Sequence, residues 1–182
     1  MRALCLGFTI VETIAAVFAI GLVAAVALPH FGSQQRDLRI AKLQQARGAV
    51  QSAAALLHGV AQARLNQPQG PCIAVGFGAN PPLVNTAGNG NLCTETGRVQ
   101  VMRLFPAPTL AGIVASAGLV PVAGTPTPAQ LAHDGLQGVS EPDALQIRIA
   151  GAPDAASCAF TYRAPASLGM PPVITGLVTS GC

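Results

Sequence analysis

An almost uncharged apolar run near the N-terminus limits what this chain can fold into more than any other feature. Residues 8–28 contain one charged side chain, that of Glu12. As an α-helix with a rise of about 1.5 Å per residue, the run would be roughly 31 Å long, close to the thickness of a bilayer core. A carboxylate is costly to place in lipid, so the position of Glu12 indicates a functional role.

Residues 7–12 read Gly-Phe-Thr-Ile-Val-Glu and lead directly into the rest of the apolar run. This arrangement resembles the N-terminal motif of type IV prepilins and of the related pseudopilins of type II secretion. The resemblance implies that residues 1–7 are a leader peptide, that cleavage separates Gly7 from Phe8, and that the new Phe8 amine is N-methylated. It also implies that Glu12 of one subunit pairs with the Phe8 amine of its neighbour during assembly.

Pro29 ends the apolar segment 8–29 and predicts a kink in the helix. Residues 30–65 are expected to continue as an amphipathic helix, because apolar side chains recur there at helical spacing. The expected stripe consists of Ile40, Leu43, Ala46, Val50, Ala53, Ala54, Leu57, Val60 and Ala61. The Pro- and Gly-containing stretch 66–71 ends this helix, whose apolar stripe then needs cover from the rest of the chain.

Residues 66–182 are expected to form a globular head that provides this cover. A loop over 72–97 comes first, then a strand over 98–105 and a short helix over 109–118, with Thr109 as its N-cap and Gly118 as its stop. Residues 119–142 predict an irregular connection, and strands at 144–150, 158–163 and 172–179 predict an antiparallel sheet. The predicted fold class is therefore α+β, and a long N-terminal helix packed on a C-terminal sheet is pilin-like.

Five cysteines are present, and Cys5 lies in the expected leader. The other four are Cys72, Cys93, Cys158 and Cys182, and an even number in an exported chain indicates disulfides. Three connectivities are open. The sequential one closes two loops of about twenty residues and would contribute roughly 3 kcal/mol for each. Zinc binding is the competing interpretation, but no Cys-x-x-Cys pair supports it.

Composition and motifs argue against catalysis. Only 9% of the residues are charged and tryptophan is absent. The sequence contains no Gly-x-Ser-x-Gly motif and no phosphate-binding loop, and nothing marks a nucleophile with its base. His30, His58 and His133 are scattered without metal-ligand spacing. We therefore expect no enzyme activity, no metal and no cofactor.

A basic row follows the apolar segment and consists of Arg36, Arg39, Lys42 and Arg47. It could contact lipid headgroups, DNA or neighbouring subunits, and an ordinary solvated helix flank is the alternative. The net charge of +3 is too small to indicate nucleic acid by itself. Counting these charges alone would place the N-terminus outside the membrane, whereas the prepilin resemblance implies that it lies inside.

The leading hypothesis is a type IV pilin, major or minor. Such a chain would cross the bacterial inner membrane once, be processed by a prepilin peptidase and methyltransferase, and then join copies of itself or other pilins in an extracellular filament. The resemblance implies a role in adhesion, twitching motility or DNA uptake. Two alternatives stay open, a pseudopilin of a type II secretion system and a membrane-anchored binding domain that does not polymerise.

Overall fold

The computed structural model describes residues 10–70, 72, 83–95 and 97–182, apart from the side chains of 26–33. The chain divides into two units, Met1–Leu38 and Arg39–Cys182. One long helix, α1 (Ile10–Ala63, 54 residues), contributes to both units. The second unit adds an α+β head with two antiparallel sheets, so the predicted fold class is confirmed at this level.

Helix α1 continues through Pro29 without a break. A proline removes one backbone donor, and the neighbouring hydrogen bonds of a long helix can persist around it. The kink predicted at Pro29 stays a prediction. The helix ends at Ala63, two residues earlier than expected, and Asn66 follows with a left-handed φ of 55°. Asparagine tolerates this conformation better than most residues, because its short amide can bond locally.

The head contains two sheets. Strands β1 (Gly90–Thr94), β2 (Gly97–Met102) and β3 (Phe105–Pro106) form the first, in the order β1-β2-β3. Strands β4 (Leu136–Glu141), β5 (Ala144–Ile149), β6 (Ala159–Arg163) and β7 (Val173–Ile174) form the second in sequence order. Three short helical segments complete the head, namely η1 (Leu110–Val114), α2 (Pro128–His133) and η2 (Ala155–Ser157).

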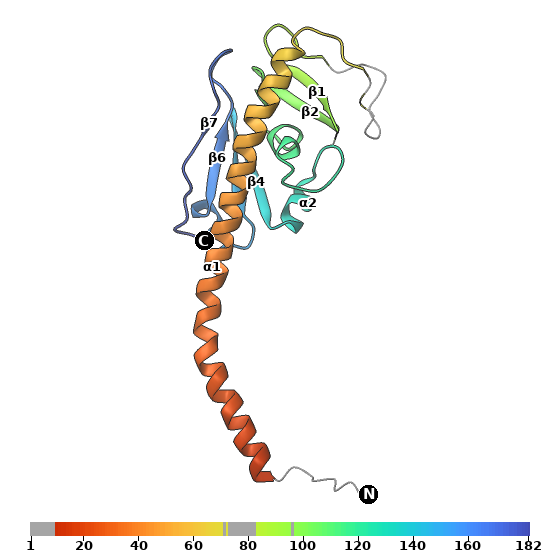
Figure 1. Cartoon of the computed structure of the whole chain (residues 1–182). Coiled ribbons are helices and arrows are strands. Elements are labelled where there is room, and N and C mark those ends of the chain that lie inside the picture. The colour runs from red at the N-terminus through yellow and green to blue at the C-terminus, as the bar shows by residue number, and fades with distance from the viewer. Residues whose placement is uncertain (1–9, 71, 73–82, 96) are drawn as a thin grey trace, which may run out of the picture. The chain divides into compact units, whose positions relative to one another are not determined.

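The main core lies between the second half of α1 and the four-stranded sheet, which run side by side in Figure 1. Leu43 and Val50 on the helix are fully buried. Facing them, the cross-strand pairs Leu145–Tyr162 and Ile147–Phe160 come from β5 and β6. The alternation predicted for 144–150 and 158–163 therefore places the expected side chains inside.

A second, smaller core joins the last turns of α1 to the three-stranded sheet. Leu57 and Ala61 on the helix pack with Leu92, Val99 and Val101 from β1 and β2. The predicted stripe is thus confirmed over most of its length, because its buried members include Leu43, Ala46, Val50, Ala53, Ala54, Leu57 and Ala61. The other two are Ile40, which is half-buried against the main core, and Val60, which is 37% exposed.

The strand predicted over 98–105 is two strands. Arg103 and Leu104 have φ values of 52° and 69°, and the chain turns back there so that Met102 pairs with Phe105. Consecutive left-handed residues are what a two-residue hairpin requires, although glycine and asparagine usually supply them. The sequence offered neither at these positions, which is why the turn was not predicted.

The irregular connection predicted over 119–142 is also wrong, because it contains α2 and β4. Thr127 caps α2, and its hydroxyl accepts from Gln130 N while the Gln130 side chain accepts from Thr127 N. This Thr-Pro-Ala-Gln pattern is a capping box with proline at the first helical position. The loop expected over 72–97 likewise contains β1. By contrast, the predicted Thr109 cap and Gly118 stop are confirmed, with Gly118 at φ 59°.

Candidate functional site

Apart from Glu12 and Thr13, the side chains at the described start of α1 are apolar or absent on every side of the helix. All side chains from 10 to 25 are exposed in the isolated chain. The large apolar ones are Ile10, Val11, Ile14, Val17, Phe18, Ile20, Leu22 and Val23, each at least 56% exposed. A helix that is hydrophobic all round is normally buried, either in lipid or among other helices. This segment therefore has the surface of a helix that is normally buried, although its described side chains are exposed.

Glu12 lies in the first turn of this apolar segment and is the one acidic residue there. Gly7 and Phe8, the predicted cleavage residues, lie outside the described residues, as does the methylated amine that the resemblance implies. Among the residues that the structure describes, no helix reaches the length and hydropathy of a membrane-crossing segment.

The four predicted cysteines are paired in the sequential connectivity. Cys72 bonds Cys93, with Cα atoms 5.3 Å apart, and Cys158 bonds Cys182, with Cα atoms 4.8 Å apart. The zinc interpretation of these cysteines is wrong, because a disulfide sulfur is not a thiolate ligand. Cys158 and Cys182 belong to the main core, whereas Cys72 and Cys93 are half-buried at the margin of the three-stranded sheet.

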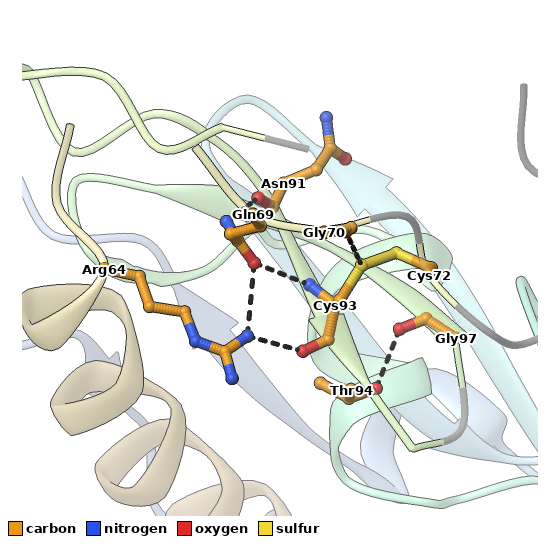
Figure 2. Close-up of a disulfide and its surroundings, with 8 residues drawn as sticks. All are labelled: Arg64, Gln69, Gly70, Cys72, Asn91, Cys93, Thr94 and Gly97. Atoms are coloured by element: carbon orange, nitrogen blue, oxygen red, sulfur yellow. Dashed lines mark hydrogen bonds between the residues drawn. A yellow bond between two sulfur atoms is a disulfide. The ribbon is translucent and has the colours of Figure 1, made fainter. Parts of the chain in front are cut away.

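Figure 2 shows the side chains of Arg64 and Gln69, which follow α1, beside the first disulfide. Gln69 is buried, and its Oε1 accepts from Cys93 N at 3.1 Å while its Nε2 donates to Asn91 O at 3.1 Å. Arg64 donates to Gln69 Oε1 and to Cys93 O. Gln69 therefore bonds β1 as a neighbouring strand would, a role that no local sequence signal revealed.

Two residues of the basic row, Arg39 and Arg47, donate hydrogen bonds to the C-terminal segment. Arg39 donates from Nη1 to Cys182 O at 2.9 Å, and Arg47 donates from Nε to Thr175 O at 3.0 Å. Both residues thus fasten the C-terminal segment to α1. Arg36 and Lys42 are exposed. Half of the row therefore makes contacts within the chain itself.

His58 and His133 lie in different parts of the head and make separate contacts. His58 on α1 stacks on Phe105 with ring centroids 4.0 Å apart and an interplanar angle of 7°. Its Nδ1 lies 3.1 Å from Leu104 O and must be the donor, since a carbonyl can only accept. His133 is exposed beside Asp134. Within the described ranges no group of three potential ligands could hold a metal ion.

Comparison with family models, with curated proteins and with solved structures found no match for this chain. The functional interpretation therefore rests on the residues themselves. The strongest feature is the exposed apolar part of α1, with Glu12 in its first turn. The disulfides and the arginine contacts belong to the head, where they hold the chain segments around α1 in place.

Proposed function

We propose that this chain is a structural subunit of a type IV pilus, held in the inner membrane before assembly and built into an extracellular filament afterwards. The observation that carries the proposal is the largely apolar, exposed surface of α1 over residues 10–25, in which Glu12 is the only charged residue. The prepilin-like motif at residues 7–12 gives this surface its context.

The exposed apolar side chains at the start of α1 would be stabilised by cover. Fully burying one large aliphatic or aromatic side chain stabilises by about 1.5–3 kcal/mol. Eight such side chains are exposed between residues 10 and 23. A single chain in water therefore does not gain the favourable free energy of burying them. Lipid would provide cover before assembly, and the same segments of neighbouring subunits would provide it in the filament.

Glu12 supplies specificity in this scheme. An isolated carboxylate in an apolar environment is strongly disfavoured, whereas a carboxylate paired with a cation in good geometry is tolerated. The amine of Phe8, created by removal of the leader, would be such a cation on a neighbouring subunit. One pair per subunit would fix the axial register between helices that otherwise present only apolar surface.

The head suits an extracellular position. Two disulfides persist in oxidising surroundings and are rare in the cytosol. Together with the arginine contacts to the C-terminal segment, they give the head its own stability, independent of the apolar segment. A head of this kind can remain folded while the first part of α1 moves from lipid into a filament.

The test compares Glu12→Ala with Glu95→Ala, which changes an exposed glutamate of the head, in the native cell. Membrane insertion is expected to be unchanged in both variants, while filaments seen by electron microscopy should be lost only with Glu12→Ala. The intact mass and N-terminal sequence of the wild-type chain should show a start at methylated Phe8. An uncleaved Met1, or filaments unaffected by Glu12→Ala, would contradict the proposal.

A further inference from the structure

The outer face of the three-stranded sheet carries a small open pocket of about 290 Å³. Leu92, Val99 and Val101 point from this sheet into the smaller core, so the alternate residues of β1 and β2 point outward. Asn91 and Gln100 are direct cross-strand partners on that outer face. Their side chains, with that of Asn89 and with Met102, surround the pocket.

Two of the three amides have a fixed orientation. Asn89 Oδ1 accepts from Arg103 N at 2.9 Å, and Gln100 Oε1 accepts from the Thr109 hydroxyl at 2.9 Å. Because the oxygen ends are occupied by the protein, the NH₂ ends of both amides are the ends available to a ligand. In Figure 2 the Asn91 amide points away from the cluster of Gln69 and Arg64.

The turn that carries Asn89 is itself well ordered by hydrogen bonds. Asn85 N donates to Asn89 O at 2.9 Å, and Asn85 Oδ1 accepts from Asn89 N at 3.0 Å. Gly88 O accepts from Leu104 N, which ties this turn to the β2–β3 hairpin. A site whose polar groups are held before binding loses less entropy when a ligand arrives.

One side of the pocket is apolar. Met102 lies two residues from Gln100 on β2 and therefore on the same outer face, and Ala107 also lines the pocket. Arg103 is the one charged residue among the lining residues, and its guanidinium donates to Pro165 O. The lining of the pocket thus combines neutral amides, apolar side chains and one guanidinium.

From this arrangement we infer that the pocket binds a neutral carbohydrate residue. A sugar hydroxyl both donates and accepts, as the amides of asparagine and glutamine do, and the C–H face of a pyranose suits the thioether side chain of Met102. A cationic ligand would find no carboxylate among the lining residues, and an anionic one would find only Arg103, whose guanidinium already donates to Pro165 O. Either ligand would have to lose its hydration. The inference concerns the head and does not depend on filament formation.

The test uses the full chain in detergent micelles, labelled with ¹⁵N, and follows the side-chain NH₂ signals of Asn89, Asn91 and Gln100. Glucose, galactose and N-acetylglucosamine are added separately at about 10 mM, which is enough to detect millimolar affinity. Glucuronate is added as the charged counterpart. We expect at least one neutral sugar to shift the signals of Asn91 and Gln100.

The double variant Asn91→Ala with Gln100→Ala should weaken that binding by about tenfold or more, because two hydrogen-bonding groups are lost. Gln137→Ala, which removes an exposed amide from β4 of the other sheet, should bind as the wild type does. The signal shifts of the wild-type chain test sugar binding without any variant. A folding defect in the double variant would therefore not obscure the result. No shift with any neutral sugar, or shifts with glucuronate alone, would overturn the inference.

Discussion

The hydroxyl of Tyr162 donates a 2.7 Å hydrogen bond to the carbonyl of Pro106, and both groups are buried. Tyr162 lies on β6 of the four-stranded sheet and Pro106 on β3 of the three-stranded sheet. This single bond therefore joins the two sheets through the interior. It also satisfies a carbonyl that, in a buried position, has no access to water.

Replacing Tyr162 by phenylalanine should destabilise the head by about 1–3 kcal/mol, because the Pro106 carbonyl would lose its buried partner. Thr161→Val is the matched control, since it removes a hydroxyl from the neighbouring residue of β6 that makes no such contact between the sheets. Urea unfolding of the full chain in detergent measures both. Equal stability of Tyr162→Phe and the wild type would mean that the bond contributes nothing.

Alkaline pH should weaken the head through the same residue. Burial raises the pKa of Tyr162 well above its ordinary value of 10.0. The unfolded chain therefore releases this proton first, so the stabilisation is complete below pH 10 and is lost as the pH rises further. The stability of the wild type should fall by up to ~1.4 kcal/mol per pH unit there.

The composition makes this measurement specific. The chain has one tyrosine, so tyrosinate absorbance reports Tyr162 alone. Absorbance should rise together with unfolding and not at the pH of a free phenol. Tyr162→Phe should lose this part of the pH dependence while keeping any contribution from other groups. Titration of the wild-type tyrosine near pH 10 in the folded state would contradict the assignment of the shift to burial.

The sequence predicted those features whose signals are local. The stripe on α1 follows from helical spacing, and the Thr109 cap with the Gly118 stop follows from residue chemistry. The alternation of β5 and β6 predicted which of their side chains are buried, because a two-residue period fixes the face. The sequential cysteine pairing was one of three open connectivities, and the structure selects it.

The features that were missed depend on contacts distant in sequence or on atypical residues. The β2–β3 turn uses Arg103 and Leu104 in place of glycine, and bonds from Asn89, Gly88 and His58 hold it. Gln69 acquires its role only because β1 lies beside it in the fold. The capping box at Thr127 was a local signal that could have revealed α2.

Mild reduction should open the two disulfides in a fixed order. Cys158 and Cys182 are 0% and 5% exposed, whereas Cys72 and Cys93 are half-buried at a sheet margin. Thiol–disulfide exchange requires access of the attacking thiolate to a sulfur, so Cys72–Cys93 should react first. Alkylation after brief treatment with dithiothreitol, followed by peptide mass mapping, measures the order. Simultaneous labelling of all four cysteines would contradict it.

The turn between β4 and β5 predicts that two substitutions at one position differ in their effect on stability. Glu141 pairs with Ala144, which leaves Pro142 and Asp143 as a two-residue connection, and Asp143 has a left-handed φ of 54°. Asp143→Gly should leave the stability nearly unchanged, because glycine adopts this φ without steric cost. Asp143→Val should destabilise by about 1–2 kcal/mol, since a β-branched residue is disfavoured there. Thermal unfolding of the two variants measures this difference. Equal unfolding temperatures would exclude backbone strain at position 143.

The arginine contacts to the C-terminal segment lead to a prediction about proteolysis. Arg39 and Arg47 bond Cys182 O and Thr175 O, so replacing both by alanine should loosen residues 164–182 and cost about 1 kcal/mol for each bond. Limited proteolysis should then cut this segment faster than in the wild type. The double variant Arg36→Ala with Lys42→Ala removes the same charge from exposed positions and should leave the cleavage rate unchanged. Equal acceleration in both double variants would show that the charge of the row, and not these two bonds, retains the segment.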